Sequence, residues 1–170
     1  TGLPLAASEA DATIRYGLYD PQDSLPDTWS SWIYALVAPF PTVEDGIASS
    51  DLRRAWAGEQ TGLFGGRPLL MDESTLAAFS EHWGAPAAGA VRLVPTGRLL
   101  EEAWAARPSW AIIPFEDLEP RWKVLTIDGQ SPIRRGFNPV SWPLTLTFAF
   151  KSSAYPHLST SLPATNLDAS

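Results

Sequence analysis

Two continuous apolar runs constrain the fold of this chain more than any other feature. The first run, WIYALVAPF, covers residues 32–40, and the second, WAIIPF, covers residues 110–115. Apolar runs without polar alternation are typical of strands that are buried on both faces of a sheet. Because strand-like and helix-like patterns alternate along the chain, the sequence predicts an α/β domain with a mixed sheet.

Shorter patterns predict the other elements. Ser49 and Ser50 are good N-caps, so we expect a helix to begin at about Ser50. Leu52 and Trp56 lie four residues apart and would share one face of that helix. Alternation and turn residues predict further strands over residues 14–19, 68–71, 91–94, 122–127 and 142–150, and further helices over 74–83, ended by Gly84, and 99–106.

Charge and composition exclude several classes of function. Acidic residues outnumber basic ones by 19 to 12, giving a net charge of -7 without a basic patch, which argues against a nucleic-acid partner. No window approaches the roughly 18 apolar residues that a membrane span needs, so we expect no span in this chain. The chain has no cysteine, which excludes disulfides and thiolate chemistry.

Catalytic and metal-binding patterns are weak. The chain has two histidines, His82 in a predicted helix and His157 in the tail, and a catalytic triad would have to join this tail to a helix. No HExxH or similar spacing indicates a metal, and we expect no cofactor. The sequence therefore predicts a non-enzyme. The alternative from another class is a small hydrolase or transferase with an acidic site at Asp72 or Glu73.

Three segments carry a resemblance to a known family. ALVAPFPTVEDGIASSDLRRAWAGE (35–59), WAIIPFEDLEPRWKVLTIDGQSPI (110–133) and WPLTLTFAF (142–150) resemble phosphate-type members of the type II periplasmic binding proteins. The similar features are two hinge strands, a Ser-Asp-Leu helix start and an Ile-Asp-Gly-x-x-Pro turn. The same segments are similar to the N-terminal domain of some bacterial CapA-family proteins, which are associated with poly-γ-glutamate capsule synthesis.

This resemblance implies two small lobes that are joined by hinge strands and hold a ligand between them. Residues 1–151 would form the domain, with lobe 1 from residues 1–34 and 116–151 and lobe 2 from residues 41–110. Residues 152–170 are rich in Ser, Thr, Pro and Ala, which is typical of a linker. In the CapA family, such a linker would lead to a metallophosphoesterase-like domain in the same polypeptide.

The resemblance also indicates where a ligand would bind. Residues 71–75 stand where phosphate binders carry a Ser-Gly-Thr loop, so Ser74 and Thr75 are candidate hydrogen-bond donors. Asp72 and Glu73 would repel an anion there, and the alternative is that Ser74 only caps a helix while the two carboxylates offset its dipole. The adjacent residues Arg134 and Arg135 would clamp a carboxylate if their loop faced the ligand. The candidate ligand-binding residues are Thr42, Asp72, Ser74, Thr75, Arg134 and Arg135.

The sequence thus favours a non-catalytic solute-binding module of a cell-surface protein, located outside the cytoplasm and linked to capsule or envelope polymer metabolism. Its partners would be a small polar or anionic ligand and a following domain of the same polypeptide. A solute receptor that serves a transporter is the further alternative.

Overall fold

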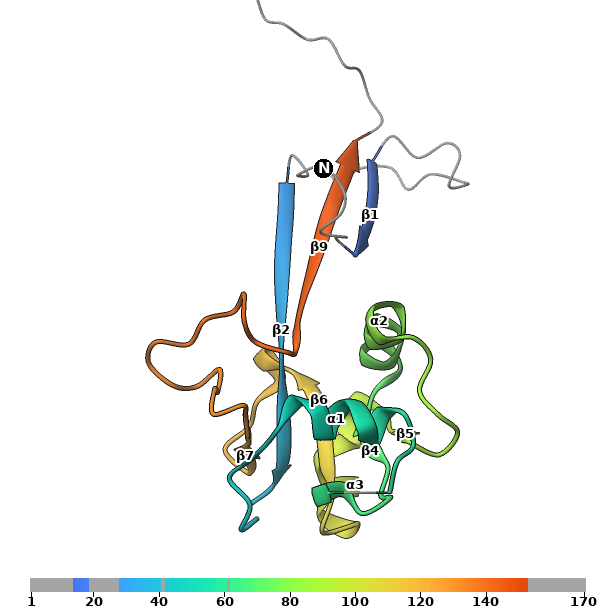
Figure 1. Cartoon of the computed structure of the whole chain (residues 1–170), viewed down its shortest axis with the longest axis vertical. Helices are drawn as coiled ribbons and strands as arrows, with labels where there is room; N and C mark the ends of the chain where they lie inside the picture. The colour runs from blue at the N-terminus through green and yellow to red at the C-terminus, as the bar shows by residue number, and fades with distance from the viewer. Residues whose placement is uncertain (1–13, 19–27, 41, 61, 153–170) are drawn as a thin grey trace, which may run out of the picture.

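The fold is organised around one long central strand. The computed structural model describes residues 14–18, 28–40, 42–60 and 62–152. Strand β2 (Thr28–Pro39) lies in a seven-stranded mixed sheet of order β1-β9-β2-β6-β4-β5, with β7 also paired to β2 (Figure 1). A separate parallel pair joins β3 to β8. The mixed α/β architecture agrees with the sequence prediction.

The described elements follow the predicted alternation of strands and helices. The strands that flank β2 are antiparallel to it, whereas β4 is parallel to both β5 and β6. The other elements are β1 (Ile14–Leu18), β3 (Gly46–Ile47), α1 (Ser49–Trp56), η2 (Gly62–Phe64), β4 (Leu69–Met71), α2 (Glu73–Trp83), β5 (Val91–Leu93), η3 (Thr96–Arg98), α3 (Leu99–Ala105), β6 (Trp110–Pro114), η4 (Phe115–Asp117), β7 (Trp122–Val124), β8 (Thr126–Ile127) and β9 (Thr145–Ser152).

The two apolar runs are neighbours at the centre of the sheet. Ala35 pairs with Ile113 and Leu36 with Ile112 in antiparallel register. All four side chains are buried because each run is covered on both faces. The first run is only partly buried, since Trp32 is 48% exposed at its start. The prediction of a strand buried on both faces therefore holds for the middle and end of β2.

Alternating side chains of these strands divide the core into two layers. Leu36 and Ile112 face one layer, together with buried residues of α1 and α2. Ala35 and Ile113 face the other layer, against the buried side of α3. Since successive strand residues point to opposite faces, α1 and α2 cover one face of the sheet and α3 covers the other.

Both predicted helix caps differ from the structure. Helix α1 begins after Ala48, whose side chain makes no capping bond, and Asp128 accepts a hydrogen bond from the Ser49 N–H at 3.0 Å instead. The cap thus comes from a residue 79 positions along the chain. Helix α2 is capped by Asp72, so the assignment of Ser74 as its N-cap is wrong.

Two predicted strands are shorter in the structure. Residues 122–127 form β7 and β8 with a break at Leu125, because β7 pairs with β2 while β8 pairs with β3. The closing strand begins at Thr145, and Trp142 before it packs into the core. The Trp142 indole N–H donates to the Tyr34 carbonyl oxygen at 2.8 Å.

The first half of β2 belongs to a three-stranded ribbon with β9 and β1. Figure 1 shows the ribbon rising away from the body that holds the helices. Within the ribbon, the rings of Trp32 and Phe148 lie 5.3 Å apart. Leu144, which directly precedes β9, lies in the same core layer as Phe79 of α2.

The division into two lobes stays a prediction. Residues 1–13 and 19–27, which make up most of the first part of lobe 1, lie outside the described residues, and so does the proposed linker from residue 153 onward. In the described part of the chain, no helix is both long and apolar enough to traverse a bilayer.

Candidate functional site

The order of the strands creates a crevice between β4 and β6. The chain runs from β4 through α2 to β5 on one side, and returns through α3 to β6 on the other side of β4. Helices α2 and α3 lie on opposite faces of the sheet. In open α/β sheets, ligands bind beyond the carboxyl ends of the strands at such a reversal of strand order.

A cavity of about 360 Å³ lies at this point, and we call it the switch-point cavity. Such a volume lies within the range of small-molecule sites. The start of α2, the residues from η3 into α3, the end of β6 and the segment that follows β6 contribute to its lining. The residues that line it are Asp72, Thr75, Thr96, Gly97, Leu99, Leu100, Glu101, Ile112, Ile113, Pro114, Glu116, Asp117, Leu118, Glu119, Arg121 and Trp122.

Asp72 joins the two helix starts that flank the cavity. Its Oδ1 accepts from the Thr75 N–H at 2.7 Å and from the Ser74 hydroxyl at 3.0 Å, and its Oδ2 accepts from the Thr96 hydroxyl at 2.8 Å. Burial raises the pKa of Asp72, but these hydrogen bonds outweigh it, so the pKa lies below its ordinary value. The carboxyl is therefore ionised at neutral pH.

Thr75 lies at the base of the cavity. The residue is fully buried, and its hydroxyl makes no well-aligned hydrogen bond within the part of the chain that the structure describes, although it lies close enough to Asp72 to help lower the pKa of that carboxyl. A buried polar group without a partner is costly in a folded protein and often marks a place where a water or a ligand binds. Among the described lining residues, Thr75 is thus the one whose buried hydroxyl makes no well-aligned hydrogen bond.

The mouth of the cavity is acidic. Glu116 and Asp117 belong to η4, and Glu101 lies in the first turn of α3. Burial and the neighbouring charges of Glu116 and Asp72 raise the pKa of Asp117. Arg121 is paired with Glu119 at 3.0 Å. The region around the cavity therefore carries an excess of negative charge.

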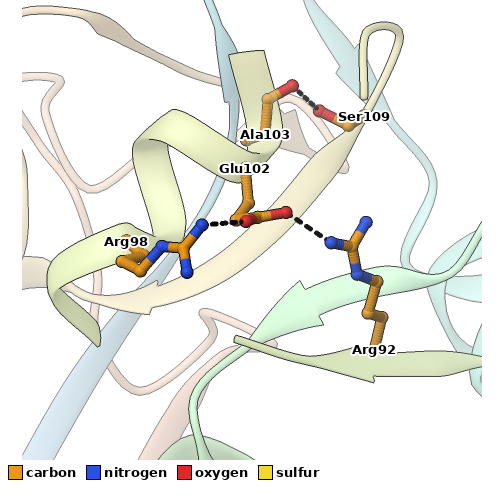
Figure 2. Close-up of polar contacts among 5 residues, drawn as sticks. All are labelled: Arg92, Arg98, Glu102, Ala103 and Ser109. Atoms are coloured by element: carbon orange, nitrogen blue, oxygen red, sulfur yellow. Dashed lines mark hydrogen bonds and ion pairs between the residues drawn. The ribbon is translucent and has the colours of Figure 1, made fainter. Parts of the chain in front are cut away.

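Polar contacts fix α3, which forms one wall of the cavity. Figure 2 shows Glu102 of α3 between Arg92 of β5 and Arg98 of η3, with a distance of 2.7 Å to Arg98. At the next residue of the helix, the Ala103 carbonyl oxygen accepts a hydrogen bond from the Ser109 hydroxyl at 2.7 Å. These contacts join α3 to β5 and to the residue that precedes β6, on the two sides of β4.

The structure brings three of the sequence-predicted site residues together. Asp72 and Thr75 line the switch-point cavity, and Ser74 lines a second hollow of about 710 Å³ that shares Asp72 and Thr96 with it. Glu73 is exposed and lines the same second hollow. Their role in ligand binding stays a prediction.

The other three predicted site residues lie elsewhere. The Thr42 hydroxyl donates to the Pro39 carbonyl oxygen at 2.7 Å, which makes a local turn. Arg134 lies close enough to Asp45 to lower its pKa, although the Lys123 ammonium is the main cause of that shift. Arg134 and Arg135 are exposed, and neither lines the cavities described above.

Two groups of lining residues escaped the sequence reasoning. The sequence patterns singled out neither Thr96 and Gly97, which precede the helix predicted over 99–106, nor residues 116–121. Their position in the sequence was the one feature that could have pointed to a ligand site. Both segments lie at the ends of buried strands or the starts of helices, where ligands bind in α/β folds.

A metal centre has no support in the described residues, since they hold no group of three or more His, Asp or Glu side chains arranged to bind an ion. His82 is exposed on α2, as predicted, and His157 lies outside the described residues. A proton-transfer role for Asp72 is also unfavourable, because both of its oxygens accept hydrogen bonds and its pKa is lowered.

Comparison with known proteins defines the class of fold. No protein-family model and no curated protein sequence matches this chain. A solved structure of an ABC-type phosphate transport receptor from Vibrio cholerae matches with a TM-score of 0.64 and 12% identity, over 86% of this chain and 69% of that one. A structure described as a phosphate ABC transporter substrate-binding protein with bound phosphate, from Clostridium perfringens, matches with a TM-score of 0.55 and 12% identity, over 85% of this chain and 68% of that one.

The chain therefore has the mixed α/β fold of the periplasmic phosphate-binding proteins. At 12% identity, the likeness shows the shared fold alone, and both similar structures are binding proteins rather than enzymes. The predicted resemblance to type II binding proteins is confirmed at the level of fold, while the resemblance to CapA-family proteins stays a prediction.

Proposed function

We propose that this chain is a solute-binding module whose ligand lies in the switch-point cavity. The observation that carries the proposal is the position of that cavity at the carboxyl ends of β4 and β6, where α2 and α3 diverge to opposite faces. The shared fold with solute receptors supports this function more directly than an enzymatic one. Both carboxylate oxygens of Asp72 already accept hydrogen bonds, which also favours ligand binding over acid–base catalysis.

The finer parts of the proposal follow from the resemblance. The module acts outside the cytoplasm, as solute receptors of this fold do, and it hands its ligand to a transporter or to another domain. The CapA resemblance adds a role in envelope polymer metabolism and a following metallophosphoesterase-like domain. The coding sequence beyond residue 170 tests that addition, because a different kind of following domain would contradict it.

Titration calorimetry tests the binding function. The panel contains inorganic phosphate, amino acids, small amines and short γ-glutamyl peptides, and at least one of them should bind at a single site. Gly97→Trp should abolish that binding by filling the cavity, since Gly97 lines it and a Cβ atom added there meets no neighbour within 4 Å. Ala105→Trp, at the far, exposed end of α3, is the matched control and should bind normally.

The absence of binding to every member of the panel would contradict the proposed function. Binding that survives Gly97→Trp would place the site elsewhere. Circular dichroism should show both variants folded, because both positions are exposed.

A further inference from the structure

The charge at the mouth of the switch-point cavity selects the sign of the ligand. Among the described residues that line the cavity, five carry carboxylates and one carries a guanidinium. That guanidinium already contacts a carboxylate at 3.0 Å. An anion entering the cavity would meet an uncompensated negative field, whereas a cation would be attracted. The five acidic residues are Asp72, Glu101, Glu116, Asp117 and Glu119, and the basic residue is Arg121.

The groups that would hold an anion are already in use. The N–H of Thr75, in the first turn of α2, donates to the Asp72 carboxylate, so an internal anion occupies the positive end of this helix. The nearby Arg98 guanidinium pairs with Glu102 on the outside of α3, as Figure 2 shows. Neither the helix start nor this arginine is available to neutralise a phosphate.

The floor of the cavity is apolar. Leu100, Ile113 and Trp122 are at least nine-tenths buried and line it, and all three belong to the core layer that α3 covers. The buried Thr75 hydroxyl, which makes no well-aligned hydrogen bond among the described residues, belongs to the same lining beside Asp72. An apolar floor with a polar anchor suits a ligand with a short hydrocarbon body. A bare metal ion would leave that floor unused, and the described residues form no metal-binding group.

We propose that the switch-point cavity binds a small primary amine with a short aliphatic body, its ammonium group lying among the carboxylates of Glu116, Asp117 and Asp72. This assignment rests on the proposed function, because it names the chemical class of the ligand for the same site. It differs from the ligand of the similar receptors in the sign of its charge.

Calorimetric titration with four compounds of matched length or charge tests the assignment: 1,4-diaminobutane, 1,4-butanediol, succinate and inorganic phosphate. The diamine should bind, and its affinity should fall as salt rises, since added ions screen the attraction. The neutral diol and the two anions should not bind measurably. Binding of the diamine should also weaken in acid as Asp117, whose pKa is raised by burial, becomes protonated.

The double variant Glu116→Gln/Asp117→Asn should weaken diamine binding by about tenfold or more, since it removes two charges from the mouth. Both residues are exposed, so the fold should persist. The matched control is Glu44→Gln/Glu81→Gln, which removes two charges at exposed positions outside the cavity and should leave the affinity within about twofold.

The possible outcomes separate this assignment from the proposed function. Binding of succinate or phosphate without the diamine would overturn the amine assignment and leave the solute-binding function intact. Equal binding of the diol and the diamine would show that charge does not select the ligand. Diamine binding that the double variant leaves unchanged would also overturn the assignment. Failure of every solute in the wider panel would overturn both.

Discussion

Asp72 offers the sharpest test of how this site is built, because one carboxylate connects two helix starts. In Asp72→Ala, the buried Thr75 N–H and the Thr96 hydroxyl lose their acceptor. The loss of an N-cap costs about 1 kcal/mol, and the loss of a hydrogen bond to a charged group costs about 1.5–3 kcal/mol. We therefore expect Asp72→Ala to lower the free energy of unfolding by about 2–4 kcal/mol.

Thermal and urea denaturation measure this change. For a chain of this length, the expected loss corresponds to a decrease in melting temperature of about 5–15 °C. Glu73→Ala is the matched control, because it removes a neighbouring carboxylate that is exposed, and it should cost less than about 1 kcal/mol through the helix dipole alone. A double-mutant cycle with Thr96→Val should show a coupling of at least about 0.5 kcal/mol.

The pH dependence gives an independent check through Asp72→Asn. Because the pKa of Asp72 is lower in the folded state than in the unfolded chain, its carboxylate stabilises the fold above the ordinary aspartate pKa. That contribution is lost as the pH falls through the folded-state pKa. The stability difference between the parent protein and Asp72→Asn should therefore be larger at about pH 7 than at about pH 3.

Two results would refute this reasoning. A cost of less than about 0.5 kcal/mol for Asp72→Ala would show that its hydrogen bonds do not stabilise the fold. A stability difference for Asp72→Asn that grows in acid would show that the pKa shift has the opposite sign.

Three further substitutions test other parts of the structure. Phe79→Ala should lower the free energy of unfolding by about 3–5 kcal/mol, measured by urea denaturation, because the ring is fully buried; a loss under about 1 kcal/mol would contradict that packing. Trp142→Phe should cost about 1–3 kcal/mol by leaving the Tyr34 carbonyl without its indole donor, whereas an unchanged melting temperature would contradict the bond. Lys123→Met should speed hydrogen exchange over residues 42–47, since its ammonium donates to the Thr42 carbonyl oxygen at 2.6 Å; unchanged exchange there would refute the anchor.

The helices show where local sequence was sufficient and where it was not. Leu52 and Trp56 were predicted to share a face of α1 from their spacing alone, and both are buried in one core layer. The cap of the same helix was predicted wrongly, because Asp128 lies far away in the sequence. Side-chain periodicity is local information, whereas a cap supplied by another loop depends on how the chain folds back.

The candidate site shows the same limit. The start of α2 was named as a candidate from the sequence, because residues 71–75 stand where the binding proteins that the chain resembles carry a Ser-Gly-Thr loop. The opposite wall, with Gly97 and Asp117, was not identified, since a glycine in a turn and an acid on the surface are ordinary locally. Only the return of α3 across the sheet brings these residues to face Asp72.

The sequence by itself determined the two buried strands, the end of α2 and the mixed α/β class, because apolar runs, helical spacing and Gly84 act over a few neighbouring residues. The tertiary structure alone decided the break at Leu125, the cap on α1 and the acidic cavity. Each of these depends on contacts between segments that lie tens of residues apart. Such contacts leave no repeating pattern in the sequence, since their geometry arises only when the sheet is assembled.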